Sequence, residues 1–325
     1  MSDEPEYGAA EYLCYEVVRQ MENRGAEVPE TAFNKLCSLV YEEVKESGVE
    51  EVDLPIQWYM YGNVVNRDYL TDDFLVEESG GWNNRGTRIG VENLPKSAFD
   101  IPEEAREVIH SVAIRFADMF QDSYGTVQIK DHSYEKQAPN EFIKVMNEFR
   151  AELDDLDAPD AANRDEYVPG VDISVGDLFE TEAETEVDAA DVDDDALREY
   201  LRRLVDAFPE ETYSEMSSDF YQWQTTCRNL IRYDLYGELR EFQEEFWRAF
   251  SRAELRIEHN KNVPLGQIRR WRRDRDEHIE EFNERLKAKQ KVVRNHREGE
   301  SGIDEYAEEY DSAVQSIYER LTTNE

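Results

Sequence analysis

Basic side chains gather between residues 269 and 297 of an otherwise acidic chain. Eleven Arg or Lys residues stand there against six Asp or Glu residues. Guanidinium and ammonium groups at this density bind the carboxylates of a protein or the phosphates of a nucleic acid. Trp271 could stack on a base or pack against a guanidinium group. The candidate partner-binding residues are therefore Arg269, Arg270, Arg272, Arg273 and Trp271.

The same segment has a purely structural explanation. Glu281 with Arg285, and Glu284 with Lys287, have the spacing of ion pairs along one solvent-facing helix. The acidic stretch 151–195 could also fold back onto it within one chain. Binding to phosphates loses its driving force as salt rises, because fewer counterions are released. On the sequence alone, these explanations outweigh a binding role.

Enzymatic motifs are not found. The chain has no Gly-rich phosphate loop, no GxSxG and no HExxH. Its five histidines lie far apart in sequence, and His278 with Glu281 at i, i+3 is expected by chance in so acidic a chain. Acidic runs such as 193–195 are typical of a solvated surface. We therefore predict no catalytic, cofactor-binding or metal-binding residues; an enzyme with an unrecognised site is the least favoured alternative.

The charge balance indicates adaptation to salt. The formal charge is −39 over 325 residues, the pI is near 4.4, and arginine far outnumbers lysine. Such a charge would destabilise a compact chain in dilute solution, whereas molar salt screens it. We expect a protein of an extreme halophile. The sequence shows no signal peptide and no membrane-spanning run, and Cys14, Cys37 and Cys227 are too scattered for a disulfide framework, which predicts a cytoplasmic protein.

The spacing of apolar residues predicts the helices and strands that position these side chains. Residues at i, i+3, i+4 and i+7 predict helices in the first half of the chain over 8–24, 29–48, 102–120 and 139–153. The aromatic stretch 54–62 is predicted as a short strand or extended loop. The Gly- and Asn-rich residues 79–90 are predicted as a loop or a hairpin.

The second half is expected to be almost wholly helical. Apolar stripes predict helices over 197–208, 220–250, 264–293 and 303–321. Long helices with short loops are typical of a bundle or of helical hairpins. The narrow stripe on 264–293 leaves a coiled-coil homo-oligomer open as a rival.

Domain organisation is predicted from a change of composition. Residues 151–195 hold eighteen acidic residues and one basic residue, Arg164, as expected of a linker. We therefore predict a mainly α protein of three parts. These are an α-rich N-terminal domain (1–150) with a short β element, an acidic linker (151–195) and a helical domain (196–325).

One family resemblance is carried by two short motifs. The first motif lies in a predicted helix and consists of Lys35, Leu36, Leu39 and Tyr41. The second consists of Trp58, Tyr61, Gly62, Val64 and Val65. Together they resemble the Panacea antitoxin domain, which reads K-L-x-x-L-x-Y and then W-x-Y-G-P-V-V. Asn63 stands where that family has proline. The resemblance is carried mainly by residues 9–66 and extends at most over 8–150.

The resemblance implies a protein-binding scaffold that neutralises a toxin, with 196–325 as the partner-specific part. Leu36, Leu39 and Tyr41 are expected in the core and Gly62 in a turn, whereas Trp58 and Tyr61 are either core residues or an exposed binding ledge. We expect an interaction module of antitoxin or regulatory type, without cofactor or membrane contact. A nucleic-acid-associated regulator or defence component using the basic helix 268–297 is the alternative, and a homo-oligomer stays open.

Overall fold

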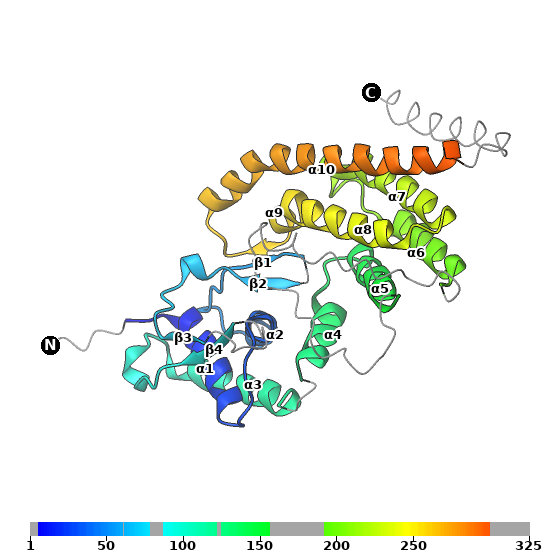
Figure 1. Ribbon diagram of the computed structural model, residues 1–325. Coiled ribbons are helices and arrows are strands. Elements are labelled where there is room, and N and C mark those ends of the chain that lie inside the picture. The colour runs from blue at the N-terminus through cyan, green and yellow to red at the C-terminus, as the bar shows by residue number, and fades with distance from the viewer. Residues whose placement is uncertain (1–5, 61, 79–86, 122–124, 157–191, 300–325) are drawn as a thin grey trace.

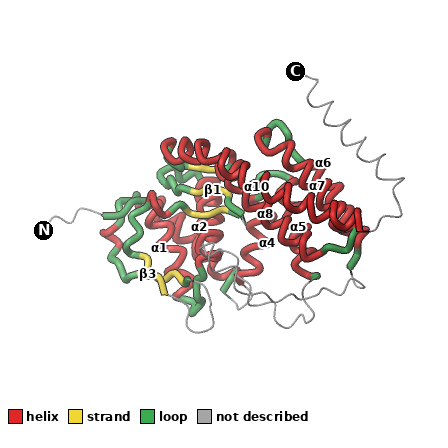
Figure 2. Tube along the Cα trace, turned by 45° about the horizontal axis from the view of Figure 1, so that its top comes forward, coloured by secondary structure: helices red, strands yellow, loops and turns green. Residues whose placement is uncertain are grey.

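The computed structural model describes residues 6–60, 62–78, 87–121, 125–156 and 192–299. Helix runs through most of this chain and strands are short, which confirms the predicted mainly α fold with a small β element (Figure 2). None of its helices is both long and apolar enough to cross a membrane. The helix predicted over 303–321 and most of the predicted linker lie outside the described residues.

Three helices form the centre of the N-terminal half: α1 (Ala9–Glu22), α2 (Glu30–Glu46) and α3 (Glu103–Met119). Pro29 and Pro102 precede α2 and α3, where a residue without an N–H loses no helical hydrogen bond. The helices pack on one another through their apolar faces and bury Leu13, Val17 and Phe33. These helices match the predicted segments 8–24, 29–48 and 102–120.

Two short sheets flank α2. Strand β1 (Ile56–Trp58) pairs antiparallel with β2 (Asn63–Val65) and, on its other edge, with β5 (Asn260–Lys261) from far along the chain. The predicted strand over 54–62 is thus present. Strands β3 (Leu75–Glu78) and β4 (Arg88–Val91) pair on either side of the predicted hairpin. Single 3₁₀ turns complete these connections: η1 (Arg67–Tyr69), η2 (Lys96–Ala98) and, further on, η6 (Ser214–Met216).

The remaining helices follow in chain order. They are α4 (Gly125–Gln137), α5 (Glu141–Asp155), α6 (Asp194–Ala207), α7 (Ser217–Arg232), α8 (Tyr236–Phe250), a π-helical turn η7 (Ser251–Leu255), α9 (Arg256–Glu258) and α10 (Leu265–Gly299). In Figure 1, α10 runs along one edge of the molecule over α7 and α8. The sequence reading did not anticipate α4, whose apolar spacing is weak.

The single helix predicted over 220–250 is two helices. Asp234 takes φ 55°, a left-handed conformation that an α-helix cannot contain, and the N–H of Leu235 closes α7 by donating to the Leu230 carbonyl at 3.0 Å. The chain then reverses, so that α7 and α8 pack face to face. Trp223 and Phe246 stack with ring centroids 4.4 Å apart. The long stripe is therefore one apolar face folded upon itself.

The described residues form two large hydrophobic clusters and a small third one around Trp271. The first holds α1, α2, α3 and the β3–β4 hairpin; the second holds α5, α6, α7, α8 and part of α10. Phe142 and Phe149 of α5, within the predicted N-terminal domain, lie in the second cluster, as does Trp58. The division into 1–150, 151–195 and 196–325 stays a prediction, but the cores do not separate at residue 150.

Direct contacts fasten the two halves together. Strand β5 completes the sheet of β1, and the indole N–H of Trp247 donates to the carbonyl of Met60 at 2.8 Å. The Asn262 side chain donates to the Tyr41 hydroxyl and to the Leu54 carbonyl, each at 3.0 Å. These bonds set the position of the chain that leads into α10.

Candidate functional site

The motif residues of α2 are interior residues. Leu36, Leu39 and Tyr41 are buried, as expected, and join α2 to the first hydrophobic cluster. Gly62 takes φ 122° in the β1–β2 turn, which an L side chain rarely adopts. These residues therefore build the scaffold.

Lys35 is the charged member of the motif and is also buried. Its ammonium group lies 5.4 Å from the ring centroid of Tyr134, as in a cation–π contact. Burial, with smaller effects of Lys130 and Arg150, lowers the pKa of Lys35 to about 7. A side chain at Gly62 would place its Cβ 2.5 Å from the Lys35 Nζ. A side chain at Gly62 would therefore displace the Lys35 ammonium group.

Asn63 has a structural role of its own. Its amide donates to the Ser38 hydroxyl at 2.9 Å, and the Gln137 amide donates to the same hydroxyl at 2.9 Å. Gln137 in turn accepts from Ser133 at 2.9 Å. This chain of bonds ties β2 to α2 and α4, a connection that a proline ring could not make.

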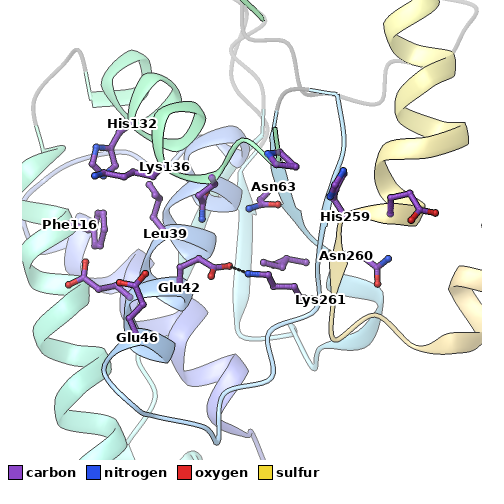
Figure 3. Close-up of a pocket in the computed structure, with 15 residues that line it drawn as sticks. Leu39, Glu42, Glu46, Asn63, Phe116, His132, Lys136, His259, Asn260 and Lys261 are labelled. Carbon is purple, nitrogen blue, oxygen red and sulfur yellow. Dashed lines mark hydrogen bonds and ion pairs between the residues drawn. The ribbon is translucent and has the colours of Figure 1, made fainter. Parts of the chain in front are cut away.

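A cleft of about 660 Å³ opens beside this network, between α2, α4 and the strand β5 (Figure 3). One wall carries Glu42, Glu43 and Glu46, and the opposite wall carries His132 and Lys136. Glu42 pairs with Lys261 at 2.5 Å and Glu43 pairs with Arg115. Within the described ranges, no three His, Cys, Asp or Glu residues could hold a metal ion.

Trp58, a candidate for the partner surface, is buried. Its side chain is 1% exposed and meets the ring of Tyr134 edge-on at 5.6 Å. Of the two alternatives for this residue, the structure shows the core and leaves no indole surface for a partner. Tyr61 lies outside the described residues.

The four candidate arginines lie together on the solvent side of α10. Arg269, Arg270, Arg272 and Arg273 are all exposed, and their spacing places them on adjoining positions of one helix face. We call these four residues the arginine surface. Arg273 lies 3.6 Å from Asp274, whereas the other three have no acidic partner among the residues that the structure describes.

Several other arginines of the chain are paired with its own carboxylates. Arg67 pairs with Asp72 and Glu77, Arg202 pairs with Glu199 and Asp206, and Arg275 on the inner side of α10 pairs with Glu215. An arginine near carboxylates of its own chain is already neutralised. Arg269, Arg270 and Arg272 of the arginine surface have no such carboxylate among the described residues.

Trp271 faces away from the arginine surface. It is 4% exposed and packs with Ile257 and Val263, and the guanidinium of Arg256 lies 5.3 Å from its ring centroid. Packing against a guanidinium, one of the two roles expected from the sequence, is what the structure shows. Trp271 therefore supports the surface from below, and its ring has almost no exposed area.

Comparisons with protein-family models, with curated proteins and with solved structures found no match.

Two exposed apolar residues near the start of α10 were not predicted from the sequence. Leu265 begins α10 and is 70% exposed, and Tyr69 of η1 is 39% exposed. Leu265 stands four residues before Arg269, a spacing that the sequence does contain. Tyr69 is distant in sequence, so only the fold brings it to α10.

Proposed function

We propose that this protein is an interaction module of antitoxin or regulatory type that binds a protein partner through the arginine surface of α10. The observation that carries the proposal is a cluster of exposed arginines, three of them without a described acidic partner, in a chain of net charge −39. Clustered guanidinium groups bind carboxylates in bidentate fashion, so an acidic patch on a protein fits them. The antitoxin type rests on the resemblance of the α2 and β1–β2 motifs.

The test is co-expression of the full chain with each protein encoded beside its gene. We expect one neighbour to inhibit growth when it is expressed alone. Co-expression of the full chain should relieve this toxicity, and the two proteins should co-purify in molar salt. If no neighbour is relieved of its toxicity and none co-purifies with the chain, the proposal is wrong.

Point variants are the suitable probes for mapping the contact. Deleting 196–325 would uncover Phe142 and Phe149 of α5, which pack in the second cluster, and would confuse loss of binding with loss of folding. Reversing exposed charges on α10 leaves the buried stripe of Trp271, Phe282 and Leu286 untouched.

A further inference from the structure

The arginine surface adjoins an exposed apolar group, Leu265. This residue is four positions before Arg269 and seven before Arg272, so it lies on the same face of α10. Tyr69 is also exposed, but its hydroxyl donates to the Gln267 side chain at 3.1 Å, on the side of α10 that carries Trp271. The surface thus combines an apolar element with four cations.

An acidic stretch bounds this surface on the same helix face. Asp276, Glu277, Glu280, Glu281 and Glu284 are all exposed and follow the arginines directly. At a rise of 1.5 Å per residue, the stretch from Leu265 to Arg273 is only about 12 Å long. A phosphate backbone that followed α10 beyond Arg273 would therefore meet five carboxylates.

Charge and shape together decide between kinds of occupant. A nucleic acid gains most of its affinity from phosphate contacts; the acidic block and the net charge of −39 oppose them. A second copy of the chain would bring the same net charge. A protein segment needs only a few carboxylates and one apolar side chain to match the surface, and Arg is a residue enriched at protein interfaces.

The surface is held rigidly, which lowers the entropy lost on binding. Trp271 anchors the same turns from below against Ile257 and Val263. Arg275 pairs with Glu215 at 2.9 Å one turn further on. The backbone that carries the arginines is therefore fixed before a partner arrives.

We propose that Leu265 and the arginine surface form a docking site for an acidic protein segment in which carboxylates flank an apolar side chain. This inference rests on the proposed function and names the chemistry of the partner. Carboxylates meet Arg269, Arg270, Arg272 and Arg273, while the apolar side chain covers Leu265.

The experiment measures binding of the full chain to dye-labelled probes by fluorescence anisotropy, in salt at which circular dichroism shows the chain folded. One probe is a synthetic helical peptide with Glu and Asp around a Leu at every third or fourth position. A second replaces each Leu by Ala, and a third is a single-stranded oligonucleotide of equal net charge. We expect the Leu peptide to bind most tightly and the oligonucleotide most weakly.

Two matched variants locate the site. Arg269→Glu/Arg273→Glu should weaken binding of the Leu peptide at least about tenfold, since each change replaces attraction by repulsion. Lys287→Glu/Lys291→Glu makes the same charge change at exposed positions on the same helix and should leave the affinity within about twofold. Leu265→Ala should weaken the Leu peptide several-fold and leave the Ala peptide unchanged.

Several results would overturn the docking site. These are equal loss in both charge-reversed variants, oligonucleotide binding as tight as peptide binding, or no dependence on Leu265. Self-association by sedimentation that Arg269→Glu/Arg273→Glu abolishes would assign the surface to a second copy. Probe binding with this pattern, but no neighbour-encoded partner, would retain the site and reject the antitoxin role. If a neighbour-encoded partner co-purifies equally well with Arg269→Glu/Arg273→Glu, the antitoxin role is retained and the docking site is rejected.

Discussion

Lys35 places an ammonium group in the interior of the N-terminal half, and the pH dependence of stability should reveal it. Its pKa is about 7 in the folded chain against 10.5 for an exposed lysine, so the unfolded chain binds more protons between these values. The free energy of unfolding should therefore rise with pH above about 7, by an amount on the order of 1–3 kcal/mol. Lys35→Met should remove this rise.

The measurement is urea unfolding at constant high salt from about pH 7 to about pH 9.5. The upper limit avoids tyrosine titration, because Tyr134, with a pKa of about 12 when folded, ionises near 10.0 when unfolded. Parallel pH profiles for the wild-type chain and Lys35→Met would show that Lys35 does not titrate in this range.

Gly62 gives a second prediction at the residue scale. Gly62→Ala should destabilise the chain by roughly 2–3 kcal/mol, because the backbone at φ 122° is strained for alanine and the new Cβ meets Lys35. Gly25→Ala is the control: its φ is 71° and no atom lies within 4 Å of the added Cβ, so only the backbone cost of roughly 1 kcal/mol applies. Thermal unfolding compares them. An equal loss in both variants would contradict the steric coupling, and Gly62→Ala/Lys35→Met should recover part of it.

At the scale of elements, Glu254 holds the π-helical turn η7 to the start of α7. Its carboxylate accepts the backbone N–H groups of Glu215 and Met216 at 3.0 and 3.1 Å. Burial raises its pKa to about 7, although these donors and Arg275 favour the charged form and Glu215 opposes it. The folded chain then binds more protons than the unfolded chain between 4.5 and about 7, so this carboxyl makes stability fall as pH rises through that window.

Glu254→Gln tests this assignment. The amide oxygen can still accept both N–H groups, so the helix contact persists while the titration is lost. The free energy of unfolding between about pH 5 and about pH 7 should fall less steeply with pH in the variant. Glu211→Gln, at an exposed carboxylate, serves as the control. Identical slopes in the wild-type chain and Glu254→Gln would refute the raised pKa.

Much of the element pattern could be predicted from apolar periodicity. The spacing of Leu13, Val17 and Met21 found α1, and that of Leu197, Leu201 and Leu204 found α6. The break at Asp234 could not be predicted, because neither glycine nor proline marks it and the stripe continues in phase. For the site, exposure of the arginines follows from their position opposite Trp271. The contact of Tyr69 with the first turn of α10 follows from tertiary structure alone.

At the scale of the whole molecule, charge should govern folding. Asp and Glu total 76 against 37 Lys and Arg, so the surface ion pairs of the described residues offset only part of the repulsion. The Debye length falls from about 10 Å at 0.1 M salt to about 3 Å at 1 M. Exposed carboxylates one helical turn apart, such as Glu277 and Glu281, lie within the Debye length of dilute salt and therefore repel each other there. Folding should therefore require salt.

Far-ultraviolet circular dichroism during dialysis from molar salt to about 50 mM tests this dependence. We expect helicity to fall in dilute salt and to return when salt is restored. Sucrose at equal osmolality should restore less, because it favours compact states without screening charge. The two halves meet through β5, the Trp247–Met60 bond and the Glu42–Lys261 pair. Of these contacts, only the ion pair should weaken as salt rises. Screening should therefore stabilise the folded chain while the two halves stay in contact. Full helicity at low salt would show that packing alone outweighs the charge.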